Sequence, residues 1–205
     1  MTLEDGIDLK RWRPLSVRQT AELMIGLEVE WWIAGGWAID LFLDRTTRDH
    51  ADTDVLVLRR DQVRVCLNFL NAGWDLWAVD RPDHLRPLKR DETVPSSVND
   101  IWCRPDRRSA WALQLMLGES EGKSWIYRRD REVSLPLSEV GLHTPDAVPY
   151  VAPQIELLFK SRSPRPRDEA DFTLAMTELS PPARRWLALA ITRADPEHPW
   201  LKRLQ

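Results

Sequence analysis

A short apolar run that ends at two glycines sets the strongest limit on how this chain can fold. The bulky apolar residues from Trp31 to Ala34 predict a buried strand, and the stretch from Trp37 to Leu43 predicts a short helix. Gly35 and Gly36 stand between them, where unpaired N–H groups at a helix start attract anions and glycine lets a phosphate approach closely. A plain tight turn is the other interpretation of this pair, and the glycines alone do not decide between the two.

Two aspartates introduce the next apolar strand, which is predicted over 54–58. Asp52 and Asp54 lie two residues apart, so their side chains point to the same face of an extended chain. Neighbouring carboxylates repel one another unless a cation lies between them, and hard oxygen ligands favour Mg²⁺. Such a pair can also simply solvate a loop. Its position close behind the glycine turn favours a phosphate and metal site.

The order of the predicted elements indicates an α+β fold with a small helical C-terminal portion. Residues 80–96 are charged and interrupted by proline, so they are predicted to form a loop. We expect two parts, a sheet domain over 1–150 and a helical portion over 151–205. Further strands are predicted over 74–79, 98–103, 110–117, 125–127 and 133–135, and helices over 16–28 and 61–72 and from about 152, 167 and 181 onward.

Composition argues against several classes of protein. The 205 residues include 29 Lys and Arg against 32 Asp and Glu, and this net charge of −3 makes nucleic acid an unexpected partner. Cys66 and Cys103 are too few for a disulfide framework, so both are expected to be reduced and buried. The polar N-terminus and the lack of an apolar stretch of about 20 residues predict a cytoplasmic protein without a signal peptide or membrane span.

The stretch around the two glycines and the two aspartates carries a dense motif. It reads Gly35-Gly36-Trp37-Ala38-Ile39-Asp40, followed by Thr47-Arg48-Asp49-His50-Ala51-Asp52-Thr53-Asp54. This pattern resembles the nucleotidyltransferases of the DNA-polymerase-beta-like superfamily, in particular the aminoglycoside and lincosamide adenylyltransferases. A looser likeness extends to Lys160 and to Arg167-Asp168-Glu169-Ala170-Asp171-Phe172. The resemblance implies a mixed β-sheet nucleotidyltransferase core flanked by helices.

The same resemblance implies roles for individual residues. Asp52 and Asp54 are the implied catalytic residues and would hold Mg²⁺. The expected partners are a nucleoside triphosphate, ATP first, and a small-molecule acceptor whose hydroxyl attacks the α-phosphate and releases pyrophosphate. Asp168 and Asp171 are expected to organise the joint between the last helices. The implied nucleotide-binding residues are Gly35, Gly36, Trp37, Arg48, His50 and Lys160.

One position departs from the superfamily pattern. The family usually has a third carboxylate on a neighbouring strand, and Gln114 occupies the corresponding place here. A glutamine amide can bind a metal through its oxygen, but it cannot take a proton at useful pH. Three explanations stay open: an acid displaced to Glu119, Glu121 or Asp100, an enzyme that works without this base, or a nucleotide-binding protein that has lost catalysis.

The sequence therefore predicts a Mg²⁺-dependent nucleotidyltransferase, with an aminoglycoside-like antibiotic as one candidate acceptor. The acidic residues of 80–96 alternate with Arg and Lys, so this loop is no clear site for a cationic antibiotic. The alternatives are a catalytically silent nucleotide-binding or regulatory protein, and an enzyme that modifies a partner protein as in toxin–antitoxin pairs. Because 11 residues are tryptophan, and Trp102 and Trp111 fall on the predicted hairpin beside the metal site, we expect an aromatic-walled acceptor pocket.

Overall fold

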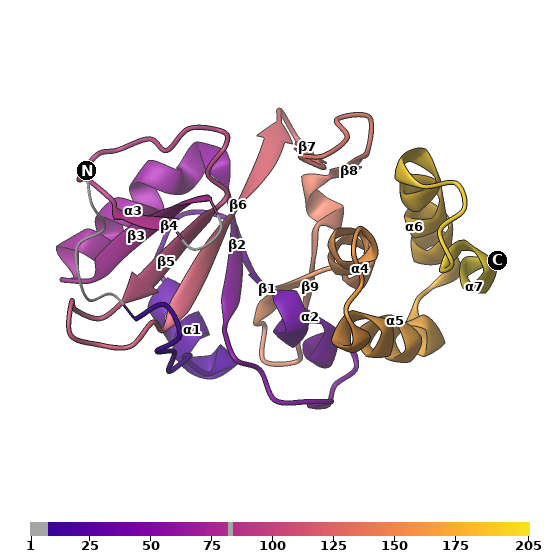
Figure 1. The fold of residues 1–205 in the computed structure, drawn as a ribbon, viewed down its shortest axis with the longest axis horizontal. Helices are drawn as coiled ribbons and strands as arrows, with labels where there is room; N and C mark the ends of the chain where they lie inside the picture. Colours follow the sequence, from indigo (N-terminus) through magenta and orange to yellow (C-terminus); the bar gives the residue numbers. More distant parts are fainter. Residues whose placement is uncertain (1–7, 82–83) are drawn as a thin grey trace.

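A mixed sheet positions the residues of the motif. The computed structural model of the chain describes residues 8–81 and 84–205. Within them the sheet runs in the order β4-β3-β5-β6-β2-β1-β10-β9 (Figure 1), and β7 and β8 extend it from the C-terminal end of β6. The strands are β1 (Trp31–Ala34), β2 (Asp54–Leu58), β3 (Asp75–Arg81), β4 (His84–Pro87), β5 (Asp100–Arg104), β6 (Leu113–Glu121), β7 (Ser124–Ile126), β8 (Ser134–Pro136), β9 (Gly141–His143) and β10 (Pro149–Val151).

One helix links the glycine turn to the C-terminal helices. α2 contacts β1, β2 and β10 on the sheet and also contacts α4 and α5. Figure 1 shows α4, α5 and α6 at the opposite end of the molecule from β3 and β4, with α2 between them and the sheet. The helices are α1 (Val17–Met24), α2 (Gly35–Phe42), α3 (Gln62–Asn71), α4 (Pro153–Ser161), α5 (Pro166–Glu178), α6 (Pro181–Ala194) and α7 (Leu201–Leu204), with 3₁₀ turns η1 (Arg59–Asp61) and η2 (Leu137–Glu139).

Strand register brings four residues into one row across the sheet. β1 and β2 are antiparallel and pair Ala34 with Asp54, whereas β2 and β6 are parallel and pair Asp54 with Gln114. β6 and β5 are antiparallel and pair Gln114 with Trp102. Residues that lie directly opposite one another on paired strands project to the same face. Asp54, Gln114 and Trp102 are therefore neighbours on one face.

The tryptophans contribute mainly to the interior. Trp125 and Trp200 are each only 1 % exposed and belong to the main apolar cluster. A second, smaller cluster contains Trp77, Leu85 and Trp111. Burying an aromatic side chain of this size stabilises the folded state by about 1.5–3 kcal/mol or more. Much of the tryptophan excess is thus explained by packing.

The α+β class with C-terminal helices is confirmed, and most predicted elements lie within a few residues of their expected bounds. The helix after the glycine turn begins at Gly35 rather than at Trp37. Cys66 and Cys103 are free and buried, as expected. No helix in the described parts of the chain combines the length and the apolar character that crossing a bilayer requires.

The loop predicted over 80–96 is wrong where the chain forms β4. This strand pairs antiparallel with β3 at the edge of the sheet. Its Arg86 pairs with Asp80 and Glu92, and its last residue is Pro87. Charged residues and proline are common on edge strands, where they resemble a loop in sequence. β9 and β10 are not predicted at all, because each is short and includes a glycine or a proline, residues that are depleted in strands.

Candidate active site

Both glycines of the turn are required by side chains that lie against them. Gly35 has a φ of +66°, a left-handed conformation, and a Cβ on it would overlap the carboxylate of Asp54. A Cβ on Gly36 would overlap the guanidinium of Arg48 and the ring of His50. The glycine pair is therefore more than a plain tight turn, because it admits three of the motif's own side chains.

Glu156 is a residue of this site that the sequence analysis did not single out. It is buried in the first turn of α4, and its Oε1 accepts a hydrogen bond of 3.0 Å from the backbone N–H of Gly35. Burial raises the pKa of Glu156 to about 7, although the charge of Lys160 and the Gly35 hydrogen bond act to lower it. The spacing of four residues between Glu156 and Lys160, which places both on one helix face, is the sequence signal that could have found it.

The paired aspartates form an acidic end of the site. Asp54 begins β2, and Asp52 lies exposed just before it. Burial raises the pKa of Asp54 well above its usual range, and the charges of Asp52, Glu156 and Asp100 raise it further. Crowded carboxylate oxygens of this kind suit a divalent cation, whose charge relieves their repulsion.

A metal at this position needs ligands beyond the two aspartates. Among residues 8–81 and 84–205, no three His, Cys, Asp or Glu side chains lie close enough together to hold a metal ion. The amide oxygen of Gln114, water or substrate phosphates are hard oxygen donors that can complete the shell, as is common for Mg²⁺. The donor set therefore fits Mg²⁺ bound together with a phosphate substrate.

Two neighbours fix the side chain of Gln114. Its Oε1 accepts a hydrogen bond of 2.9 Å from the indole N–H of Trp102, and its Nε2 donates one of 3.2 Å to Oδ1 of Asp100. Burial raises the pKa of Asp100, while the charge of Arg128 and the Gln114 hydrogen bond act to lower it. Gln114 thus stands beside Asp54, and its contacts with Trp102 and Asp100 of β5 set the orientation of its amide.

The other two candidates for a displaced acid are engaged elsewhere. Glu119 forms an ion pair of 2.5 Å with Arg59, and Glu121 pairs with Arg131. Both lie further along β6 than Gln114, at about 3.3 Å per residue. Of the three acids, Asp100 is the one that contacts Gln114.

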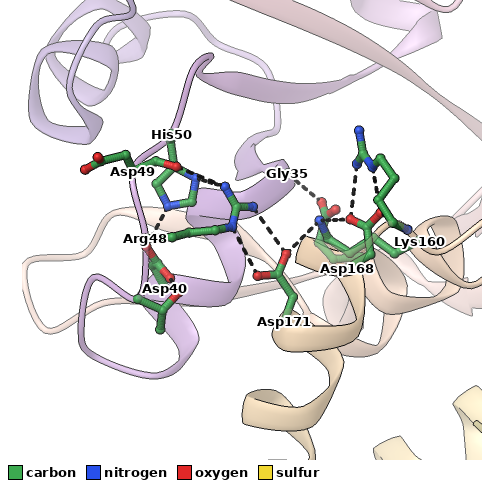
Figure 2. Close-up of polar contacts among 11 residues, drawn as sticks. Gly35, Asp40, Arg48, Asp49, His50, Lys160, Asp168 and Asp171 are labelled. Atoms are coloured by element: carbon green, nitrogen blue, oxygen red, sulfur yellow. Dashed lines mark hydrogen bonds and ion pairs between the residues drawn. The ribbon is translucent and has the colours of Figure 1, made fainter.

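His50 lies behind the glycine turn in a buried polar group. Its Nε2 is 2.6 Å from Oδ2 of Asp40, and the Thr47 hydroxyl donates to Oδ1 of the same carboxylate at 2.5 Å. The indole of Trp37 lies against the His50 ring, with the ring centroids 4.2 Å apart. Figure 2 shows His50 between Asp40 and the guanidinium of Arg48, whose Nη1 is 3.1 Å from Nδ1 of His50. These contacts hold the segment that carries Arg48.

Carboxylates from α5 fix the two cations of the site. Arg48 donates to both oxygens of Asp171 at 3.3 and 3.2 Å (Figure 2), and Nζ of Lys160 lies 3.0 Å from the same carboxylate. Lys160 also donates to Asp168 at 3.3 Å, and Nε of Arg165 does so at 2.7 Å. Asp168 and Asp171 therefore position site cations as well as organising the helical joint.

The pKa of Asp168 reflects these contacts. Its burial acts to raise the pKa, but the hydrogen bonds from Arg165 and the charge of Lys160 outweigh this effect. The pKa of Asp168 is therefore held well below its usual range. The carboxylate stays ionised and keeps Lys160 and Arg165 in place.

A cavity of about 480 Å³ gathers most of the predicted residues. Trp37 and His50 lie behind its wall, Trp102 contacts Gln114, and Trp111 is 1 % exposed in the second apolar cluster. The expected tryptophan wall is therefore absent from the described lining, whose aromatic residue is Phe159. The lining includes Gly35, Gly36, Gln114 and Met116, the carboxylates Asp52, Asp54, Glu156 and Asp168, and the cations Arg48, Arg129, Lys160, Arg162, Arg165 and Arg167.

Known proteins match the chain in two ways. Residues 16–84 match the family model of aminoglycoside-2''-adenylyltransferase, and no curated protein matches the chain. ANT(2'')-Ia in complex with adenylyl-2''-tobramycin has a TM-score of 0.56 at 16% identity, over 87% of this chain and 96% of that one. The solution structure of the antibiotic-resistance factor ANT(2'')-Ia has a TM-score of 0.55 at 15% identity, over 91% of this chain and 94% of that one. The lincomycin-bound lincosamide antibiotic adenylyltransferase LnuA has a TM-score of 0.53 at 14% identity, over 77% of this chain and 92% of that one.

The two kinds of match differ in extent. The family match spans the glycine turn and the aspartates Asp52 and Asp54. The structural matches extend over most of the chain, and at these identities they show a shared fold. The resemblance read from the motif is thereby confirmed: this chain has the nucleotidyltransferase fold, and its residues 16–84 match the aminoglycoside-2''-adenylyltransferase family.

Proposed function

We propose that this protein is a Mg²⁺-dependent nucleotidyltransferase that moves AMP from ATP to a hydroxyl of a small molecule. The observation that carries the proposal is the lining of the cavity. The glycine turn, Arg48 and the paired aspartates lie close together in the sequence, Lys160 lies far from them on α4, and all of them line the same space. Carboxylates for a metal beside cations for phosphates are what phosphoryl chemistry needs.

Each group has a specific task in this proposal. Asp52 and Asp54 hold the Mg²⁺, which supplies charge that stabilises the crowded phosphate oxygens. Gly36 lies in the first turn of α2, where backbone N–H groups lack helical partners and attract phosphate. Arg48 and Lys160 neutralise the triphosphate, while Trp37 and His50 keep the turn and Arg48 in position.

Gln114 orients the acceptor in this proposal and does not act as a base. The acceptor oxygen forms a bond to the α-phosphorus, the bond to the bridging oxygen breaks, and pyrophosphate leaves. The hydroxyl proton passes to water, because the amide of Gln114 cannot take it. Asp100 holds Gln114 through the hydrogen bond of 3.2 Å and acts as a positioning residue.

The test combines binding with turnover. Calorimetry with each nucleoside triphosphate and Mg²⁺ is expected to give binding that is strongest for ATP and weakened in Asp52→Asn. Pyrophosphate release is then followed over a panel of hydroxylated acceptors that begins with tobramycin and lincomycin, which are named in the relatives' structures. Absence of nucleotide binding by the wild-type protein contradicts the proposal.

A second function, nucleotide binding without transfer, has one observation in its favour. Gln114 stands where the superfamily usually has its third carboxylate, so a general base is missing at that place. This alternative predicts normal ATP binding and no pyrophosphate release with any acceptor, whereas the proposed enzyme releases pyrophosphate with at least one.

A further inference from the structure

The cations that line the cavity fall into two sets. Arg48, Lys160 and Arg165 are each ion-paired to Asp168 or Asp171, so their charges are largely balanced within the protein. The other three, Arg129, Arg162 and Arg167, form no ion pair with the residues that the structure describes. The cavity therefore presents cationic groups beyond those that α5 already neutralises.

Two residues, one of them on α4, anchor the side chain of Arg129. Arg129 lies in the segment after β7, and its Nη1 donates hydrogen bonds of 3.3 Å to the carbonyl oxygen of Phe159 and to the hydroxyl of Tyr127. Gln114 and Met116 of β6 line the cavity as well. An acceptor oriented by Gln114 would therefore occupy the same cavity as Arg129.

The side chain of Arg128 lies near the same aromatic ring as that of Arg129. The Cζ atoms of Arg128 and Arg129 lie 5.4 and 5.6 Å from the ring centroid of Phe159. Arg128 is half-buried, and burial together with the charge of Arg129 lowers its pKa, while Asp100 acts to raise it. A guanidinium that lines the cavity without an ion pair to any described residue is suited to an oxyanion, since the planar fork of Arg matches carboxylate and phosphate geometry.

Outside the proposed metal site, the described lining of the cavity lacks free carboxylates, which a polycationic antibiotic would require. Gln114, Met116, Arg129 and Phe159 carry no carboxylate, and the cavity's own carboxylates lie at the metal end or are paired with cations. A molecule with several ammonium groups would face like charge here, and like charges brought together in a binding site oppose association.

We propose that the acceptor is a hydroxyl compound that carries a phosphate or carboxylate group, and that Arg129 binds this group. The inference rests on the proposed function and narrows its acceptor class. It also separates this chain from the tobramycin and lincomycin complexes of its structural relatives.

The test uses sugars that differ in charge. Pyrophosphate release with MgATP is measured for glucose 6-phosphate, glucuronate, glucose and glucosamine. The first carries a phosphate and the second a carboxylate, so the two compounds show which oxyanion is preferred, whereas glucose is neutral and glucosamine is cationic. Binding of the same compounds to the protein saturated with Mg²⁺ and a non-hydrolysable ATP analogue is measured by calorimetry, which requires no turnover. We expect an anionic sugar to bind at least about tenfold tighter than glucose and glucosamine, because its oxyanion gains charge-assisted hydrogen bonds.

Variants identify the residue responsible. Arg129→Glu is expected to weaken binding of the anionic sugar about 10- to 100-fold and to leave the affinity for ATP unchanged, while Arg129→Lys restores part of it. Arg185→Glu is the matched control, since it makes the same charge change at an exposed arginine outside the cavity lining.

The outcomes separate the two proposals. Preference for glucosamine, equal binding of all four sugars, or a loss of ATP affinity in Arg129→Glu would overturn the anionic-acceptor inference and leave the proposed function standing. Failure of the wild-type protein to bind any nucleotide contradicts the proposed function itself.

Discussion

Gln114 stands directly beside Asp54 on the adjacent parallel strand, at the place where a third carboxylate would meet the proposed metal site. Trp102 hydrogen-bonds to the oxygen of its amide, and Asp100 hydrogen-bonds to the nitrogen. A residue fixed by two hydrogen bonds has a defined orientation, which is how neighbouring groups commonly tune a catalytic side chain. Substitutions at Asp100 can therefore separate an orienting role from an acid–base role.

Asp100→Ala is expected to lower pyrophosphate release about 10- to 100-fold, because Gln114 loses a partner that positions it. Asp100→Asn keeps an oxygen acceptor for the Gln114 amide and is expected to retain most of the activity. Steady-state kinetics with the best acceptor provide the measurement. Glu119→Ala serves as control, since Glu119 pairs with Arg59 away from the cavity. Equal losses in Asp100→Asn and Asp100→Ala would instead indicate that the Asp100 carboxylate takes a proton.

Asp54→Asn is expected to separate activity from stability. Removing one charge from the crowded carboxylates relieves repulsion, so the metal-free variant should be as stable as the wild type or more stable by about 1 kcal/mol. Pyrophosphate release should fall at least about 100-fold, and removing Mg²⁺ with EDTA should produce a similar loss in the wild type. Urea denaturation tests the expected stability, and a pyrophosphate assay tests the expected loss of activity. Asp146→Asn, on an exposed loop, should change neither.

His50→Ala is expected to destabilise the protein by about 3 kcal/mol, because it removes a partner from the buried Asp40 carboxylate. The substitution also uncovers the face of Trp37. Urea denaturation monitored by tryptophan fluorescence gives the free energy of unfolding. His143→Ala is the control on an exposed strand residue and should stay within about 0.5 kcal/mol of the wild type. A small effect of His50→Ala would show that the pair is dispensable for folding.

Asp168→Asn is expected to make stability less dependent on pH in the acid range. The folded protein holds the pKa of Asp168 well below its usual range, so this carboxylate contributes stability above its unfolded pKa of about 3.9. That contribution is lost as pH falls towards the folded pKa. Asp168→Asn should therefore cost about 2 kcal/mol at pH 7, and the difference from the wild type should shrink at pH 3. A difference that does not change with pH would contradict the assignment.

The local part of the candidate site could be predicted from the sequence, whereas of its long-range part the sequence pointed to Lys160 but not to Glu156 or to the pairing of Arg48 with Asp171. The glycine turn and the paired aspartates lie close together along the chain, and their types and spacing carry the chemistry. Glu156 and Asp171 reach the turn from α4 and α5, more than a hundred residues away, through contacts that no local pattern encodes. The role of Arg129 depends in the same way on the packing of its segment against Phe159.

The fold followed the same division. Elements with a clear period or a glycine stop, such as β2 and α3, appear near their predicted bounds. β4, β9 and β10 are defined by pairing at or near an edge of the sheet, and their own residues give only a weak signal. The boundary at residue 150 stays a prediction, and β10, which pairs with β1, ends just beyond it.

The hydrogen bond from Gly35 to Glu156 and the ion pair of Arg48 with Asp171 both join residues on opposite sides of that boundary. Each of the two segments thus holds only an incomplete site. If 1–150 and 151–205 are produced as separate polypeptides, neither is expected to bind nucleotide, and binding should return only when they reassociate. Nucleotide binding would then report on the docking of the C-terminal helices, which lie far along the sequence from the motif that first marks the site.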